Sequence, residues 1–180
     1  MSDASPFEAF VREYQDMVFA TALRLLANRS EAEDMAQTVF LKAFERFEDL
    51  RTSAAVPGWL KTVTTNLCLN HLSRYRSRWR LFSEMGRDDE QGGGGYEATV
   101  PSTETPGAEL EAADERQQLE RALRRLPRHQ RIPLVLFHYE DRSYQEIAAL
   151  LGVSLGKVKT DIHRGREALK NALVMPHGLR

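Results

Sequence analysis

The residues best suited to chemistry lie in one stretch near the C-terminal end, where cations alternate with hydrogen-bonding side chains. Lysine and arginine contact phosphates, while threonine and histidine can hydrogen-bond to base edges. The side chains that the pattern leaves on the open faces of one helix are Lys157, Lys159, Thr160, His163, Arg164 and Arg166. This combination predicts contact with DNA, although a basic face that is merely solvated would have the same composition.

The element that must position these side chains has the pattern of a helix-turn-helix. In SYQEIAALLGVSLGKVKTDIHRGREAL, Gly152 is expected at the turn, with Val158 and Ile162 facing inward from the second helix. Ser143 and Glu146 form a capping box that starts the first helix. Two helices separated by a short turn are therefore predicted.

Two further helices are expected before this motif. Apolar spacing indicates one helix over residues 119–126, stopped by Pro127, and a second, strongly apolar helix over residues 132–139. Pro133 is tolerable only in the first turn of that second helix. Downstream, Ser154 can cap the helix that carries the cations.

A second basic segment, HLSRYRSRWR, lies near the middle of the chain. No carboxylate interrupts its arginines, which are Arg74, Arg76, Arg78 and Arg80. Guanidinium groups clamp phosphates, and the interleaved rings of Tyr75 and Trp79 offer faces on which unpaired bases can stack. A solvated helix end, or aromatic rings that close a core, would show the same pattern.

The N-terminal part of the chain is predicted to be helical as well. Three-and-four spacing of apolar residues indicates an amphipathic helix over residues 6–27. Ser30 and Glu33 form a capping box for a second helix, and a third opens at Pro57 or Gly58 after the loop-like stretch EDLRTSAAVPG. We therefore expect an all-α chain with a helical bundle in its first part.

Charge is strongly segregated along the 180 residues, although the net charge is only −1. Residues 1–83 carry a net charge of +1, residues 84–120 a net −9 and residues 121–180 a net +7. The acidic stretch includes four consecutive glycines and little apolar periodicity, which is typical of a flexible linker. The expected division is a first domain over 1–83, a linker over 84–112 and a second domain over 113–180.

Several other classes of protein are disfavoured. The apolar stretches are far shorter than a membrane span, and the N-terminus has no basic-then-apolar signal, so we expect a cytoplasmic protein without membrane insertion. Cys68 is the one cysteine, and the five histidines form no metal-ligand motif. The glycine run lacks the Gly-Lys-Ser/Thr of a phosphate-binding loop. We expect no enzyme, no cofactor and no metal.

Four segments, in this order along the chain, resemble a known family. They are EAEDMAQTVFLKAF, PGWLKTVTTNLCLNHLSR, LPRHQRIPLVL and SYQEIAALLGVSLGKVKTDIHRGREAL. Together they are similar to sigma factors of bacterial RNA polymerase, specifically the extracytoplasmic-function (ECF) group of the sigma-70 family. The resemblance implies that the first domain is sigma-2, which binds core polymerase and melts the minus-10 element, and that the second is sigma-4, which reads the minus-35 element.

The resemblance also implies where the polymerase docks. Four residues at helical spacing match the positions with which the family binds the clamp helices of the largest polymerase subunit: Asp34, Gln37, Leu41 and Phe44. Their spacing puts them along one stripe. The alternative is that Leu41 and Phe44 belong to the core, with only Asp34 and Gln37 facing outward.

By the same resemblance, the minus-10 element is expected to meet a polar loop and the helix after it. The matching residues are Leu50, Arg51, Thr52, Ser53, Asn66 and Asn70, with Arg74 and Arg76 further along. A base flipped out of the stack must recover hydrogen bonds and a stacking partner, which such a loop beside asparagines could supply. The asparagines could instead be ordinary surface residues.

In sigma-4 the resemblance assigns Lys159, Thr160 and the pair His163 and Arg164 to minus-35 recognition, with Lys157 and Arg166 on phosphates. Asp161 departs from the family pattern, since many relatives have a basic residue there. Its carboxylate could pair with Lys157 or Arg164, or accept a hydrogen bond from a cytosine amino group.

Two functions follow from these patterns. A sigma factor would bind core polymerase and promoter DNA, and relatives are commonly held by an anti-sigma protein. The alternative is a conventional helix-turn-helix regulator, which would bind duplex DNA without polymerase. The acidic linker fits a strand threading a basic polymerase channel, or a merely soluble tether.

Overall fold

The computed structural model describes residues 5–83 and 108–174, with side chains described for 5–73 and 112–174. The chain divides into two compact units, Met1–Gly86 and Arg87–Arg180. Within the described ranges there are eight helices and no strand, which confirms the all-α fold class. Most of the expected linker, 84–112, lies outside the described residues, although a helix begins at Ala108 within its assigned bounds.

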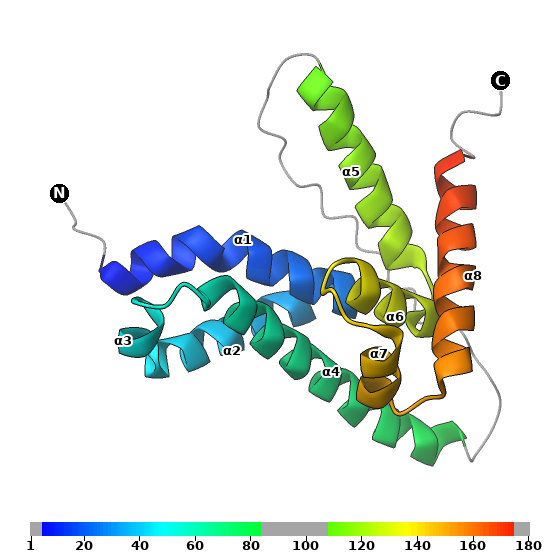
Figure 1. Ribbon diagram of the computed structural model, residues 1–180, viewed down its shortest axis with the longest axis horizontal. Helices are drawn as coiled ribbons and strands as arrows, with labels where there is room; N and C mark the ends of the chain where they lie inside the picture. Colours follow the sequence, from blue (N-terminus) through cyan, green and yellow to red (C-terminus); the bar gives the residue numbers. More distant parts are fainter. Residues whose placement is uncertain (1–4, 84–107, 175–180) are drawn as a thin grey trace. The chain divides into compact units, whose positions relative to one another are not determined.

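The first unit contains four helices (Figure 1). Three are long: α1 (Pro6–Leu26), α2 (Arg29–Glu45) and α4 (Val56–Ser83), and each packs against the other two. The fourth, α3 (Phe47–Leu50), is a single short turn between α2 and α4. Ser5 caps α1 through a capping box with Glu8. The resulting bundle leaves one face of α2 uncovered.

The core of this unit is built from the apolar stripe of each helix. Its fully enclosed side chains include Val18 on α1, Val39 on α2 and Leu60 on α4. Aromatic rings close the end nearest α3, where the ring centroids of Phe10 and Phe47 are 5.5 Å apart. Cys68 is buried in the α4 face, as expected of a small apolar side chain.

The capping box expected at Ser30 and Glu33 does not form. Ser30 does not cap α2, because Asn28 takes the cap position and its side chain accepts a hydrogen bond from the Glu31 amide at 3.1 Å. Glu33 instead pairs with Arg29 at 3.0 Å. The helix starts early because Ala27 adopts a left-handed conformation (φ 53°) that ends α1 abruptly.

The stretch after α2 is also more helical than expected. Residues 48–50 belong to α3, and α4 already begins at Val56, one residue before Pro57. The loop between them is therefore shorter than the sequence EDLRTSAAVPG indicates.

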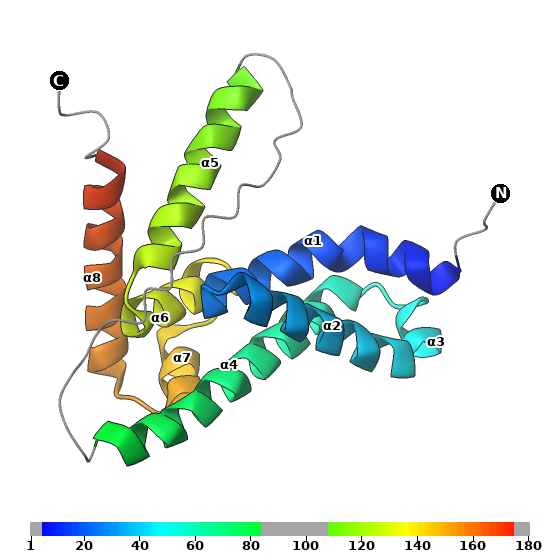
Figure 2. The ribbon, with the colours of Figure 1, turned by 180° about the vertical axis from the view of Figure 1, so that it is seen from behind.

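The second unit is formed by α5 (Ala108–Arg125), α6 (Arg128–His138), α7 (Tyr144–Leu151) and α8 (Leu155–Val174). Helix α8 packs against the other three, and α6 also contacts α7, as both ribbon views show (Figures 1 and 2). Leu123, Val135, Leu136, Ile147 and Ile162 are fully buried between them.

The position of Pro133 differs from the expectation. Helix α6 begins at Arg128 because the Pro127 carbonyl accepts hydrogen bonds from the Gln130 and Arg131 amides, which makes Pro133 an interior residue. A proline here leaves the His129 carbonyl without its helical donor, and His129 is exposed, so water can replace that donor.

No helix among the described residues is both long and apolar enough to span a membrane.

Candidate nucleic-acid interface

Helices α7 and α8 form the predicted helix-turn-helix, and its caps are where the sequence placed them. The Glu146 amide donates to Ser143 Oγ at 3.1 Å and the Ser143 amide to Glu146 Oε2 at 2.7 Å. Hydrogen bonding from Ser143 lowers the pKa of Glu146. Gly152 takes the left-handed conformation at the turn (φ 65°), and Ser154 Oγ accepts from the Lys157 amide at 3.2 Å. The three local predictions for this motif are therefore confirmed.

The inward face of α8 fixes the orientation of the helix. Val158 and Ile162 are buried, as predicted, and Gly165 lies directly against α6. A Cβ atom at Gly165 would sit 3.0 Å from Leu134 Cδ1 and 3.4 Å from the Gln130 carbonyl oxygen. The close approach at Gly165 fixes the rotation of α8, and the side of the helix that carries Lys159, Thr160, His163 and Arg164 is exposed.

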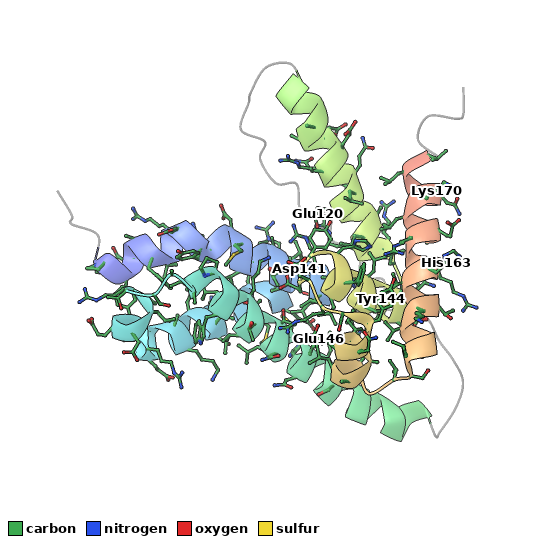
Figure 3. All side chains as sticks on the ribbon, in the orientation of Figure 1. Glu120, Asp141, Tyr144, Glu146, His163 and Lys170 are labelled. Atoms are coloured by element: carbon green, nitrogen blue, oxygen red, sulfur yellow. The ribbon has the colours of Figure 1, made fainter. Side chains whose placement is uncertain are left out.

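Four of the predicted DNA-contacting residues share the exposed side of α8: Lys159, Thr160, His163 and Arg164. Figure 3 shows the His163 side chain on the side of the helix turned away from α6 and α7. Thr160 Oγ1 donates to the Gly156 carbonyl at 3.0 Å, so its lone pairs stay available as acceptors. This face presents two cations and two hydrogen-bonding side chains to one partner.

Lys157 and Arg166, the two cations assigned to phosphates, both have partners within the unit. Lys157 Nζ is 2.7 Å from Asp161 Oδ2, and the Asp161 side chain is only 7% exposed. Of the alternatives that the sequence left open for Asp161, the structure shows the pair with Lys157.

Arg166 is held by the end of α6. Its Nε donates to His138 Nε2 at 3.2 Å, and its guanidinium lies over the Phe137 ring at 5.5 Å from the centroid. Burial and the nearby Arg166 charge lower the pKa of His138, so the neutral imidazole is the form that accepts this hydrogen bond. The sequence pattern gives no sign of this contact, because His138 lies 28 residues before Arg166.

Arg131 is a buried charged residue that the sequence patterns do not single out. It is buried, and its Nη1 donates to the Leu126 carbonyl at 2.9 Å, which satisfies the end of α5. Burial, together with the charge of Arg128, lowers the pKa of Arg131 to about 10. The guanidinium therefore remains charged at neutral pH and has a structural role in this unit.

In the first unit, the stripe predicted on α2 is exposed along its whole length. Asp34 and Gln37 face solvent, and Leu41 and Phe44 are 67% and 62% exposed. Phe44 touches the bundle only at its edge, with its ring centroid 4.9 Å from that of Phe7. The alternative in which Leu41 and Phe44 belong to the core is therefore wrong.

The loop after α3 borders a groove of about 440 Å³. Arg51, Thr52 and Ser53 line it together with residues of α1, including Phe10 and Tyr14. Burial and the neighbouring Glu13 raise the pKa of Tyr14. The groove combines aromatic rings with hydroxyl groups, as a site for a planar polar ligand requires.

Two of the residues expected beside this loop, the asparagines of α4, lie away from the groove. Leu50 is 7% exposed and packs in the core, yet it also borders the groove, as does the equally buried Phe10. Asn66 and Asn70 are exposed on α4, and neither lines the groove. The side chains of Arg74 and Arg76 lie outside the described residues, although the helix itself continues to Ser83.

No group of three or more His, Cys, Asp or Glu side chains is arranged to hold a metal ion in the part of the chain that the structure describes.

Each of the two units contains a segment that matches a model of the sigma-70 family. The model of sigma-70 region 2 matches residues 10–79, and the model of sigma-70 region 4 matches residues 116–169. A co-crystal structure of the sigma factor RpoE in complex with the anti-sigma factor NepR from Bartonella quintana has a TM-score of 0.53 at 22% identity. That similarity covers 94% of this chain and 98% of the RpoE chain. At this identity the likeness concerns the fold.

Curated relatives extend the comparison to nearly the full chain. The ECF RNA polymerase sigma factor SigE of Mycolicibacterium smegmatis is 37% identical over 93% of this chain, which spans 61% of the length of that relative. SigW of Bacillus subtilis is 29% identical, with 95% of this chain and 90% of SigW covered. EcfG of Rhodopseudomonas palustris is 30% identical, with 86% of this chain and 77% of EcfG covered. The resemblance inferred from the motifs is thus confirmed, and the chain belongs to the ECF sigma factors of the sigma-70 family.

Proposed function

We propose that this chain binds bacterial core RNA polymerase and directs initiation at promoters that it selects through two DNA elements. The first unit acts as the sigma-2 domain and the second as the sigma-4 domain, with residues 84–112 as the tether. The chain performs no catalysis of its own, since RNA synthesis belongs to the polymerase. Such a factor works in the cytoplasm.

The outward face of α8 is the observation that supports DNA binding by the second unit. Lys159, Thr160, His163 and Arg164 project from one helix that Gly165 holds against α6. A helix presented in this way enters the major groove, where lysine and arginine read guanine and where threonine contacts several bases. We assign these four residues to the minus-35 element and Arg166 to a neighbouring phosphate.

The polymerase-binding part is supported by the exposed stripe on α2. Asp34, Gln37, Leu41 and Phe44 form a surface of two polar and two large apolar side chains. An exposed apolar pair with polar neighbours is typical of a protein interface, and a DNA backbone would offer it nothing to pack against. We assign this stripe to the polymerase.

For the minus-10 element we retain the groove beside α3. Arg51, Thr52 and Ser53 would hydrogen-bond to a flipped base that enters beside Phe10 and Tyr14. Asn66 and Asn70, exposed on α4, would contact the DNA outside that groove, with Arg74 and Arg76 beyond them on the same helix. An anti-sigma protein is a further expected partner.

The test is transcription by core polymerase with and without the full-length chain, on fragmented genomic DNA of the source bacterium. The RNA 5′ ends are sequenced and the upstream DNA is compared. We expect new start sites that share two upstream elements. Start sites unchanged by the chain would contradict the proposal.

A further inference from the structure

The inward face of α8 contains one residue that does not fit an apolar core. Along this face the buried residues are Val158, Asp161, Ile162 and Gly165. Asp161 is 5% exposed, although aspartate is almost never buried without a partner. The carboxylate therefore needs an explanation in terms of the group that it holds.

The contacts of Asp161 identify that group as the ammonium of Lys157. Lys157 Nζ donates to Asp161 Oδ2 at 2.7 Å, one helical turn away. The Lys157 side chain is 47% exposed, so its stem reaches along the helix surface while its charged end turns toward the buried carboxylate. Lys159 differs, since it is exposed and the described contacts include no ion pair for it.

Breaking the ion pair costs Asp161 more free energy than it costs Lys157. A lysine at the surface is well solvated without a counter-charge, whereas a buried carboxylate that loses its cation is left uncompensated. The position of the ammonium is thus determined mainly by the needs of Asp161. Moving the Lys157 ammonium onto a DNA phosphate would leave the Asp161 carboxylate buried without a counter-charge, which is unfavourable.

We propose, on the basis of the proposed function, that Asp161 is a positioning residue of the minus-35 helix that sets how strongly this helix binds the DNA backbone. It withholds the Lys157 ammonium from the DNA backbone. Contacts to phosphates are independent of sequence, so one fewer such contact lowers the affinity for all DNA by the same factor and makes binding less dependent on salt. The discrimination made by the base-reading contacts stays the same. The carboxylate acts without touching DNA itself.

The proposal predicts a distinct salt dependence for each of a set of matched variants. The affinity falls as salt rises, and each lysine that neutralises a phosphate makes the slope of log K against log salt steeper by about 0.9. Asp161→Asn keeps the shape of the side chain and removes its charge, which frees the ammonium of Lys157. Asp161→Asn with Lys157→Gln removes both charges. Lys159→Gln removes a cation that already faces the DNA.

The experiment measures binding of the reconstituted holoenzyme to a promoter found in the transcription experiment and to the same DNA with its minus-35 element shuffled. Salt is varied between about 50 and 200 mM. For Asp161→Asn we expect a slope steeper by about 0.9, with both affinities changed by the same factor and their ratio unchanged. The double variant should return to the wild-type slope, and Lys159→Gln should be shallower by about 0.9.

Two results would overturn the proposal. One is an unchanged slope for Asp161→Asn, which means that removing the carboxylate charge gives the DNA no additional cation. The other is a double variant as shallow as Lys159→Gln, which means that Lys157 already contacts a phosphate. Thermal unfolding of each variant separates loss of fold from loss of binding. Failure of the wild-type chain to form a holoenzyme would instead contradict the proposed function.

Discussion

On α2 the exposed stripe ends in two large apolar side chains, whereas the exposed face of α8 carries cations and hydrogen-bonding groups. Leu41 and Phe44 are 67% and 62% exposed, and they gain free energy when a protein surface covers them. Lys159 and Arg164 are exposed cations, which in the proposed function would release counterions from phosphates and bond to base edges. The proposed function therefore assigns polymerase to a largely apolar surface and DNA to a cationic one.

The largest effect is expected on α2. Leu41→Ala with Phe44→Ala should weaken binding of core polymerase by about 2–4 kcal/mol, because both side chains would be buried at the interface. The folded chain should be nearly unaffected, since both side chains are mostly exposed. Affinity is measured by titrating labelled chain with core polymerase.

A matched control is Lys42→Gln, which changes an exposed residue on a neighbouring face of the same helix. Its affinity for polymerase should stay near wild type. Equal losses in the control and in the double variant would show that the stripe has no special role.

On α8 the next effect concerns promoter choice. Arg164→Ala should cost about 1–3 kcal/mol of holoenzyme affinity for a cognate promoter if the guanidinium reads a base edge. Binding of core polymerase should not change. The measurement is competition between the promoter and variants with single base changes in the minus-35 element. Undiminished promoter affinity would remove Arg164 from the interface.

Within α8, Lys157 and Lys159 should differ in their effect on folding. Lys157→Met leaves Asp161 buried without its cation and should lower the free energy of unfolding by about 1–3 kcal/mol. Lys159→Met removes a solvated charge and should change stability little. Urea unfolding at neutral pH compares the two variants, and similar stabilities would show that the Asp161 pair contributes nothing.

The smallest effect is a pH dependence at the end of α6. The folded pKa of His138 lies below its ordinary value of 6.5, so the unfolded chain binds the extra proton first. The contribution of the neutral imidazole is complete above about pH 6.5 and is lost as pH falls through the lowered folded pKa. His138→Gln should flatten this part of a stability–pH curve measured by thermal unfolding. A curve identical to wild type would show that His138 does not titrate in this way.

Features determined by near neighbours in sequence were predictable. The Ser143 capping box, the turn at Gly152 and the inward Val158 and Ile162 depend on contacts within a few residues, and the structure has them as expected. The same reasoning failed at Ser30, because a serine followed by a glutamate three residues later also occurs inside a helix. The left-handed Ala27 had already moved the start of α2 to Arg29.

Features determined by packing were not predictable from spacing. Periodicity placed Leu41 and Phe44 on one stripe but could not say whether that stripe was covered. Leu50 was expected on a polar loop, yet the aromatic end of the first bundle buries it. The contact between Arg166 and His138 joins two helices and leaves no local signal.

The most direct test of the division between the two surfaces is promoter binding by the full-length chain, measured with and without core polymerase. The account predicts that selection among DNA sequences appears only in the holoenzyme, because the α2 stripe must seat the chain on polymerase before both DNA elements are engaged. If the chain alone selected the same sequence with the same affinity, it would act as a conventional helix-turn-helix regulator and the account would be contradicted.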